Sequence, residues 1–338
     1  MERDGWVQYI NSCTVDDELR SIWRSYIDSC FSNNIPVILN FQHLEFLFEL
    51  DHQILVNMVN FSEMFYREFS IPKRNGSTRN IDAPYPSLYS IQRWILDNIL
   101  SKIRIHASAF GFVKKRSVVD NAKMHLGKKC LLKMDIKEFF PSINLKRVIP
   151  IFLNLNYPQN ISYILAKLCC KNGYLPQGSP ASPYISNIVA KRLDSRLMAV
   201  SKTYFLQYSR YADDLVFSGD YIPHKFIKIV EEILQDEGFL PNKDKTKLIV
   251  GQGKKIITGI SISNGKLTIP RNMKRTLRKE AHFILLNGLE LHSAKINDRD
   301  PIYLERLIGK FNFWKCVEPE SEYVLKTLNE LKKCSSSI

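Results

Sequence analysis

The sequence predicts an α+β protein in which strands carry acidic residues and helices supply much of the remaining core. The first observation is a pair of apolar, β-rich runs within residues 204–219, which flank the adjacent Asp213 and Asp214. The second is a buried-strand pattern at residues 131–136, where an apolar run delivers Asp135 near its end. The third is apolar spacing typical of helices. It occurs at residues 16–30, 43–58, 88–100 and 223–238.

Composition favours a compact protein with a polyanionic partner. The chain has 338 residues, 45% of them hydrophobic, which is enough for a core of two or three compact units. Its formal net charge of +14 favours nucleic acid as a partner. The seven cysteines form no CxxC pair, which indicates reduced thiols rather than a zinc site or disulfide framework. No signal-peptide pattern or apolar stretch of about 18 residues is present, so we expect a cytoplasmic protein without a membrane span.

The Asp pair is predicted to lie at the tip of a β-hairpin. Successive strand residues point to opposite faces, so two neighbouring carboxylates share one site only at a turn. Like charges held together repel, and a divalent cation removes that cost. Oxygen ligands of this kind suit Mg²⁺. Taken alone, however, an Asp-Asp turn between strands is more often simply solvated.

A third carboxylate strengthens the metal interpretation. If Asp135 and Asp213 lie on neighbouring strands, they can hold two Mg²⁺ ions about 4 Å apart, the arrangement used for in-line phosphoryl displacement. Asp214 either ligates a metal or only orients the site. The sequence therefore predicts a two-metal centre with Asp135 and Asp213 as its principal ligands.

Four motifs in one order resemble those of reverse transcriptases. They are Asp135 with Phe140 five residues later, Leu175-Pro176-Gln177-Gly178-Ser179-Pro180, Tyr211-Ala212-Asp213-Asp214, and Gly238-Phe239-Leu240-Pro241-Asn242 followed by Lys245-Thr246. The resemblance implies a right-hand polymerase fold with fingers, palm, thumb and an antiparallel palm sheet. It also implies RNA-directed DNA synthesis from dNTPs.

The resemblance divides the chain into four segments. They are a helical N-terminal extension at 1–60, fingers at 61–134, a palm at 135–269 that contains part of the fingers at about 141–185, and a thumb at 270–338.

A basic hairpin is predicted in the fingers, because Asn75-Gly76 is a strong turn signal between two strand-like runs. Cations near such a tip can grip a triphosphate. Lys73 and Arg79 match the family positions that bind the incoming nucleotide. The alternative is an exposed basic hairpin that serves solubility.

Three palm residues resemble nucleotide-binding positions of the family, and a fourth resembles a catalytic one. Phe140 matches the ring that lies under the sugar and excludes a 2′-OH, although simple packing would also explain it. Gln177 lies in a tight turn that can approach a base or sugar, and Tyr211 matches the aromatic residue beside the primer end. Lys245 matches a Lys that protonates departing pyrophosphate; the alternative is a surface lysine.

Two further motifs resemble the retron reverse transcriptases. Asn121-Ala122-Lys123-Met124-His125 matches their Asn-Ala-x-x-His, and Asn121 and His125 are expected on one helical face. The resemblance implies RNA binding by both, whereas an Asn/His pair is usually a structural hydrogen-bonding pair. Ile257-Thr258-Gly259 stands where the retron enzymes have Val-Thr-Gly, a conservative departure.

The thumb carries a basic stripe followed by a helical core. Five cations at spacings i, i+3, i+4, i+7 and i+8 are expected on one helical face, where they would bind a phosphate backbone. They are Arg271, Lys274, Arg275, Arg278 and Lys279.

The resemblance to retron enzymes implies a specific reaction and set of partners. The template is expected to be a cognate structured noncoding RNA, and the primer a 2′-OH within it, which gives branched RNA-linked DNA (msDNA). A separate effector protein of an antiphage defence system is the expected protein partner. Two alternatives remain open: a reverse transcriptase of another bacterial class, and a nucleic-acid-binding protein with a vestigial polymerase site.

Overall fold

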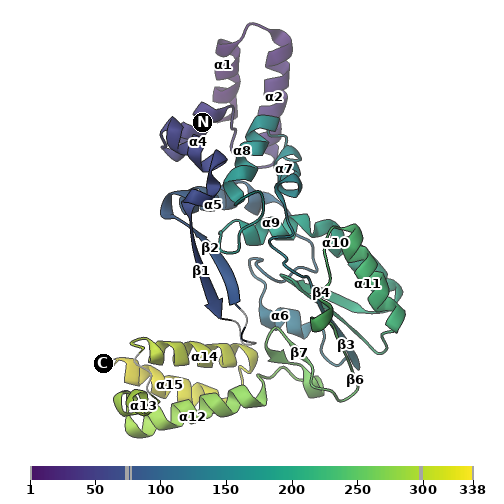
Figure 1. Ribbon diagram of the computed structural model, residues 1–338, viewed down its shortest axis with the longest axis vertical. Coiled ribbons are helices and arrows are strands. Elements are labelled where there is room, and N and C mark those ends of the chain that lie inside the picture. The colour runs from purple at the N-terminus through teal and green to yellow at the C-terminus, as the bar shows by residue number, and fades with distance from the viewer. Residues whose placement is uncertain (1, 73–75, 77, 297–299, 337–338) are drawn as a thin grey trace. The chain divides into compact units, whose positions relative to one another are not determined.

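The computed structural model describes residues 2–72, 76, 78–296 and 300–336. The chain divides into two compact units, and both are discontinuous in sequence. The first contains residues 1–113, 136–197 and 228–242, and the second contains residues 114–135, 198–227 and 243–338. These units do not correspond one to one with the expected segments, whose bounds remain a prediction. Figure 1 labels the elements.

The first unit begins with four helices. They are α1 (Arg3–Cys13), α2 (Asp17–Ser32), α3 (Phe41–Phe48) and α4 (His52–Asn60). The sequence predicted one helix over residues 43–58, and this was wrong because Glu49, with φ of 52°, ends α3 in a left-handed conformation. Asn40 caps α3, since its side chain accepts a hydrogen bond from the His43 N–H.

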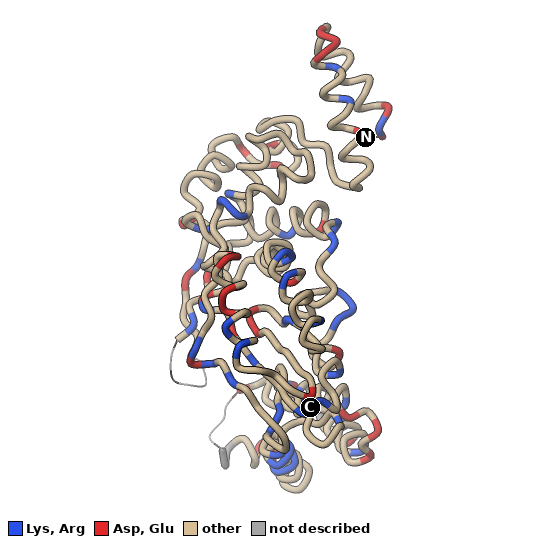
Figure 2. Tube along the Cα trace, turned by 90° about the vertical axis from the view of Figure 1, so that its right-hand side faces the viewer, with Lys and Arg blue, Asp and Glu red and all other residues tan. Residues whose placement is uncertain are grey.

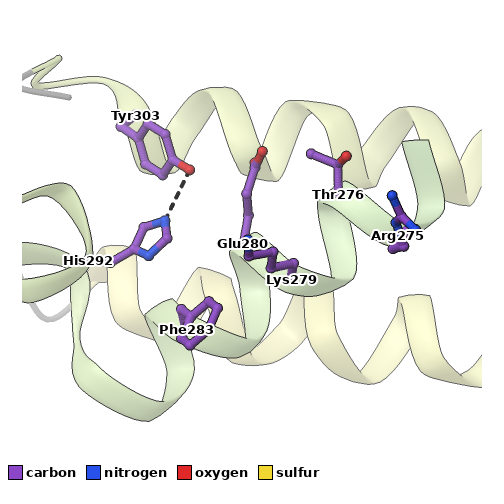
Figure 3. Close-up of a pocket in the computed structure, with 7 residues that line it drawn as sticks. All are labelled: Arg275, Thr276, Lys279, Glu280, Phe283, His292 and Tyr303. Atoms are coloured by element: carbon purple, nitrogen blue, oxygen red, sulfur yellow. Dashed lines mark hydrogen bonds between the residues drawn. The ribbon is translucent and has the colours of Figure 1, made fainter. Parts of the chain in front are cut away.

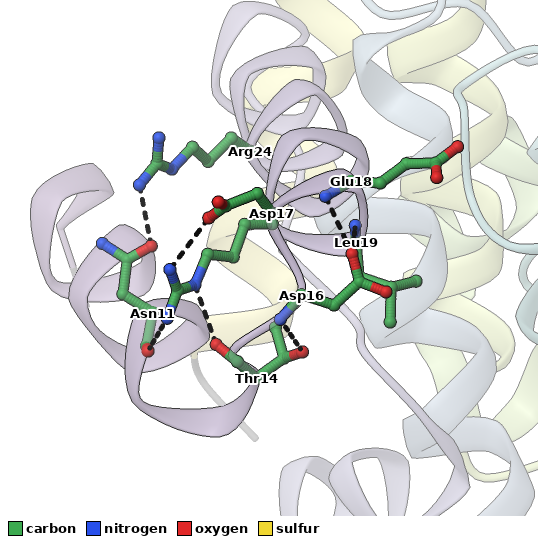
Figure 4. A network of polar contacts seen from close by, with 8 residues as sticks. Asn11, Thr14, Asp16, Asp17, Glu18, Leu19 and Arg24 are labelled. Carbon is green, nitrogen blue, oxygen red and sulfur yellow. Dashed lines mark hydrogen bonds and ion pairs between the residues drawn. The ribbon is translucent and has the colours of Figure 1, made fainter.

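The turn between α1 and α2 is held by side-chain bonds (Figure 4). The Asp16 carboxylate accepts from the N–H groups of Glu18 at 2.9 Å and Leu19 at 3.3 Å, which satisfies the first turn of α2. Arg24 of α2 donates from Nη2 to the Asn11 Oδ1 of α1 at 2.8 Å. The two helices are therefore joined by polar contacts near their connection.

The predicted basic hairpin is present in the first unit. Strands β1 (Tyr66–Pro72) and β2 (Thr78–Pro84) pair antiparallel, with Tyr66 opposite Pro84 and Pro72 opposite Thr78. Lys73 and Asn75 of its expected tip lie outside the described residues. Four further helices lie wholly in this unit, and α10 and α11 extend into the second. They are α5 (Pro86–Asn98), α7 (Leu145–Leu153), α8 (Gln159–Cys169), α9 (Ser182–Val189), α10 (Lys191–Thr203) and α11 (His224–Asp236).

The second unit contains a four-stranded antiparallel sheet with the order β4-β5-β3-β6. Its strands are β3 (Cys130–Asp135), β4 (Gln207–Tyr211), β5 (Asp214–Gly219) and β6 (Lys247–Val250). Leu131, Leu132 and Leu215 are fully buried, as the apolar run predicted. The sheet also packs aromatic rings, because the Tyr208 and Phe217 rings stack with centroids 4.9 Å apart.

The same unit continues into a small hairpin and a helical bundle. The hairpin consists of β7 (Ile256–Ile257) and β8 (Ile260–Ser261), and a short helix α6 (Val118–Lys123) contacts both β4 and β8. The bundle consists of α12 (Arg271–Asn287), α13 (Leu289–Ile296), α14 (Tyr303–Val317) and α15 (Glu322–Ser336). One apolar cluster joins the sheet to this bundle, so both share a core.

Within the described residues, no helix combines the length and apolar character needed to cross a bilayer.

Candidate active site

The Asp pair lies at a hairpin tip, as predicted. β4 ends at Tyr211, and β5 begins at Asp214, which pairs with Tyr211 on one side and with Asp135 of β3 on the other. Ala212 has φ of 55° in the two-residue turn. The first strand starts at residue 207 rather than 204, because α10 extends to Thr203. Register therefore brings Asp135 and Asp214 side by side at one edge of the sheet.

The three carboxylates form an electrostatically strained cluster. Asp135 is only 5% exposed. Burial, followed by the charges of Asp135 and Asp214, raises the pKa of Asp213 to about 6. Burial also raises the pKa of Asp214; nearby Lys133 opposes this increase and Asp135 adds to it. Repulsion between the carboxylates favours their protonated forms. A cation bound here would offset that repulsion.

Lys245 already provides one positive charge to this cluster. It belongs to a short 3₁₀ turn, Lys243–Lys245, and its Nζ donates to both oxygens of Asp135, at 3.0 Å and 2.8 Å. Burial works against the charged amine, but the bonds to Asp135 and the charges of Asp213 and Asp214 outweigh it, so the pKa of Lys245 is raised. Lys245 is therefore the counter-ion of Asp135, although its side chain is 58% exposed, and its catalytic role stays a prediction.

A small cavity of about 200 Å³ opens beside the acids. Lys133 and Lys247 line it together with Asp135, Asp214 and Lys245. The sequence interpretation missed Lys133. Its signal was its position two residues before Asp135, since strand residues of equal parity share a face. The cavity thus combines carboxylates with cations that suit phosphate oxygens.

The donor set fits a divalent cation. Within residues 2–72, 76, 78–296 and 300–336, no three His, Cys, Asp or Glu side chains converge closely enough to form a complete metal site by themselves. Mg²⁺ does not require one, because it takes one or two carboxylates and completes its shell with water and substrate phosphate. Lys245 Nζ binds both oxygens of Asp135, so this ammonium group competes with a metal ion for that carboxylate.

The expected nucleotide-binding residues are divided between the two units. Arg79 is exposed on β2, and Phe140 is half-buried with its ring centroid 6.3 Å from that of Phe112. These residues belong to the first unit, whereas Tyr211 ends β4 in the second. Lys73 lies outside the described residues. Nucleotide binding by these side chains stays a prediction.

The turn that contains Gln177 approaches β2 closely, and its predicted approach to a base or sugar stays a prediction. The Gln177 carbonyl accepts from the Asp82 N–H at 2.9 Å. Gly178 has φ of 142°, and a Cβ there would lie 2.6 Å from the Asp82 carbonyl oxygen. Only glycine suits this position. The turn is thus anchored to the basic hairpin.

Asn121 and His125 do not have the exposure that RNA contact requires. Both are fully buried, and α6 ends at Lys123, so a shared helical face is not what brings them together. Instead both side chains bond to Ser209 of β4, and His125 also bonds to Ser218 of β5. The prediction of direct RNA binding is therefore corrected: a buried pair bonded to strand hydroxyls fits the structural alternative.

The bonds around His125 fix its tautomer. Ser209 donates from Oγ to Asn121 Oδ1 at 2.5 Å, so its oxygen accepts from His125 Nε2–H at 2.7 Å. His125 Nδ1 must then accept from the Ser218 hydroxyl, also at 2.7 Å. Burial, with a smaller effect of Lys128, lowers the pKa of His125 to about 3. A neutral imidazole thus bridges β4 and β5 behind the acidic tip.

The five thumb cations are not equivalent. Figure 2 shows Lys and Arg concentrated along α12. Lys274 donates from Nζ to Glu318 Oε2 at 2.7 Å, and the Arg278 guanidinium lies 4.9 Å from the Tyr323 ring centroid. Arg271, Arg275 and Lys279 are exposed. Arg278 is exposed as well, so its contact with Tyr323 leaves it accessible, and phosphate binding by the five cations stays a prediction.

Comparison with known proteins agrees with these motifs. Residues 71–296 match the family described as Reverse transcriptase (RNA-dependent DNA polymerase). This match confirms the α+β polymerase fold class expected from the sequence.

Several relatives are retron enzymes. Retron Ec86 reverse transcriptase of Escherichia coli is 31% identical over 255 residues, which cover 74% of this chain and 79% of that relative. Retron Mx65 and Mx162 reverse transcriptases of Myxococcus xanthus are each 33% identical, over 72% and 80% of this chain. The matched regions span 63% and 62% of those two relatives, slightly less than two thirds. The chain belongs to the retron reverse transcriptases, which are RNA-dependent DNA polymerases.

Proposed function

We propose that Asp135, Asp213 and Asp214 are the catalytic carboxylates of this polymerase and hold two Mg²⁺ ions. One observation carries the proposal: the three acids gather at one sheet edge, and the pKa of Asp213 is raised to about 6. In the reaction, a primer hydroxyl attacks the α-phosphate of a dNTP and pyrophosphate leaves. Bound magnesium supplies positive charge for the attacking and leaving oxygens.

Lys245 has two successive roles in this proposal. Before metal binds, its ammonium group neutralises Asp135 through the two bonds to Nζ. Once the carboxylate turns to metal, the released ammonium group can donate its proton to an oxygen of departing pyrophosphate.

The nucleotide and the primer end are assigned to five residues. Lys73 and Arg79 bind the triphosphate as cations of the basic hairpin, with Arg79 capable of a bidentate grip. Phe140 lies under the sugar and excludes a 2′-OH. Gln177 and Tyr211 position the base and the primer end, respectively. The support for these roles is the match of each residue to its family motif.

The retron relatives support a specific template and product. We assign to this chain a cognate structured noncoding RNA as template and a 2′-OH of that RNA as primer, so that the product is branched RNA-linked DNA. We also assign to this protein a separate effector protein as its partner, a role in antiphage defence and a cytoplasmic location. A reverse transcriptase of another bacterial class is disfavoured because Ec86, Mx65 and Mx162 are all retron enzymes.

The test has two parts. Purified protein should extend a primer on an RNA template with Mg²⁺ and dNTPs, and a vestigial site would give no extension. DNA recovered from cells that carry the native locus should be released from RNA by a 2′,5′-debranching enzyme. Only unbranched DNA in those cells would reject the priming assignment while leaving the polymerase intact.

A further inference from the structure

The bundle of the second unit contains a cavity of about 720 Å³ whose lining shares no residue with the cavity beside the acids. Residues of α12, α13 and α14 line it, and Figure 3 shows the lining residues. From α12 come Arg275, Lys279, Glu280 and Phe283, and the other two elements supply His292 and Tyr303. Its volume falls within the range of small-molecule sites, which is about 300–1,000 Å³.

One side of this cavity is positive. Arg275 and Lys279 are both exposed and lie one helical turn apart on α12. Such a pair can bind a phosphate group at the mouth of the cavity.

The opposite side carries aromatic rings. The Phe283 and His292 rings are nearly parallel, with an interplanar angle of 14° and centroids 6.3 Å apart. His292 is 5% exposed, and its Nε2 lies 3.2 Å from the Tyr303 hydroxyl oxygen, which holds the ring in place. A fixed wall of flat rings suits stacking by a planar heterocycle.

Glu280 lies between these two sides in Figure 3 and has an unsatisfied acceptor. Its Oε2 is buried and accepts no hydrogen bond from described residues. Lys310 Nζ approaches to 3.6 Å, which is an ion-pair distance but not a hydrogen bond. A buried carboxylate oxygen without a hydrogen bond is unfavourable, so a ligand that donates one to it would be stabilised there.

We propose that this cavity binds one unstacked guanine of single-stranded RNA. Guanine presents N1–H and N2–H side by side, which matches the two oxygens of a carboxylate such as Glu280. Adenine, cytosine and uracil each offer fewer adjacent donors on that edge. The ring would stack on Phe283, and the adjoining phosphate would meet Arg275 and Lys279. The proposal rests on the proposed function in that it adds base selectivity to RNA binding.

An arginine from a protein partner could also satisfy Glu280, because a guanidinium presents paired N–H donors. The two cations at the mouth of the cavity disfavour such a partner, since like charges repel. They attract the phosphate that accompanies a base in RNA.

The experiment measures affinity of the full-length protein for short oligouridylates with one central guanosine, inosine or adenosine. Inosine keeps N1–H but lacks the 2-amino group. We expect the guanosine oligomer to bind about fivefold or more tightly than the inosine one, as expected when one hydrogen bond to a base is removed. Glu280→Gln should shrink that ratio towards one. The exposed Glu320→Gln, with the same charge change, should preserve it.

Equal binding of guanosine and inosine by the wild type would overturn the proposal, as would a ratio unchanged in Glu280→Gln. Primer extension on a generic template separates this from the proposed function, because Glu280→Gln should retain it. A second measurement does not depend on folding of a variant. A 6-thioguanosine oligomer should photocrosslink to Phe283 or Tyr303 of the wild type, and crosslinks found only elsewhere would reject the site.

Discussion

Two polar clusters lie on the same β-hairpin and differ in how their groups are satisfied. At the tip, Asp213 and Asp214 face Asp135, and the pKa values of both tip acids are raised. Further along the same strands, Ser209 and Ser218 bond the neutral ring of His125 at 2.7 Å each. The carboxylates at the tip repel one another, whereas the groups around His125 carry no charge.

The difference separates chemistry from structure. A group of repelling carboxylates costs stability unless a cation binds, so it indicates a functional site. The chain of bonds from Ser218 through His125 to Asn121 is neutral, and only Asn121 Nδ2 lacks a partner among the described residues. Such a network specifies a strand arrangement. We therefore assign catalysis to the tip and positioning of the tip to the network.

The largest effect should come from Asp213→Asn. This change keeps the size of the side chain and removes a charge that metal binding needs. DNA synthesis in a primer-extension assay should fall by at least about a hundredfold, the usual scale for losing one electrostatic contributor to a transition state. His125→Gln, measured beside it and corrected for the folded fraction, should retain most activity. Comparable losses in both variants would erase the distinction between the clusters.

Acid should destabilise the network, because burial keeps the His125 ring neutral in the folded state. The pKa of His125 is about 3 when folded and about 6.5 when unfolded, so the unfolded state binds the proton more strongly. This contribution is complete above pH 6.5 and is lost as pH falls from 6.5 to 3, by up to about 1.4 kcal/mol per pH unit. Ser209 and Ser218 do not titrate, and Lys128 adds to the effect.

Urea unfolding at pH 7 and pH 5 measures this loss. His125→Gln removes the titrating ring, so it should lose less free energy of unfolding than the wild type over that interval. An equal loss in both proteins would show that other groups dominate acid unfolding.

Ser209→Ala should have a smaller effect on stability alone. The change leaves His125 Nε2–H and Asn121 Oδ1 buried without their shared partner, at a cost of about 1–3 kcal/mol. Chemical denaturation checks the value, with the exposed Ser25→Ala of α2 as the matched control. Stability equal to that control would mean that the network contributes little.

The smallest effect concerns α12, where, among the described residues, Lys274 and Arg278 contact residues of the following helices or their ends and the other three cations do not. Changing Arg271, Arg275 and Lys279 to Gln should flatten the slope of log affinity for RNA against log salt, by about 0.7 to 0.9 for each phosphate that is no longer neutralised. Changing Lys274 and Arg278 should affect stability more than this slope, because they bond Glu318 and pack on Trp314 and Tyr323. A salt titration of both variants measures the two slopes. Equal flattening in both would show that all five cations contact phosphates alike.

Much of the acidic site could be predicted from the sequence because its signals are local. Apolar runs with an acid at their end place Asp135, and adjacent acids between two strands place Asp213 and Asp214 at a turn. The basic hairpin was predicted for the same reason, since Asn75-Gly76 marks its turn. Such patterns depend only on residues that are neighbours in the chain, so they can be recognised in the sequence.

The remaining features depend on contacts between residues far apart in sequence. Ser209 and Ser218 lie more than 80 residues after His125, so the burial of that ring was not visible. Likewise the contacts of Lys274 with Glu318 and of Arg278 with Tyr323 join residues that are more than 40 positions apart. The break at Glu49 was missed because apolar spacing continues across it, although a left-handed residue ends α3 there.

The most direct test of the central claim is thermal unfolding at pH 7.5 with and without Mg²⁺. If the acids at the tip lack only a cation, Mg²⁺ at tenfold excess over its dissociation constant should stabilise the wild type by about 1.4 kcal/mol. Asp213→Asn relieves the repulsion by itself, so it should begin more stable than the wild type without metal and gain less from Mg²⁺. An equal gain in both proteins, or a less stable metal-free variant, would contradict the account.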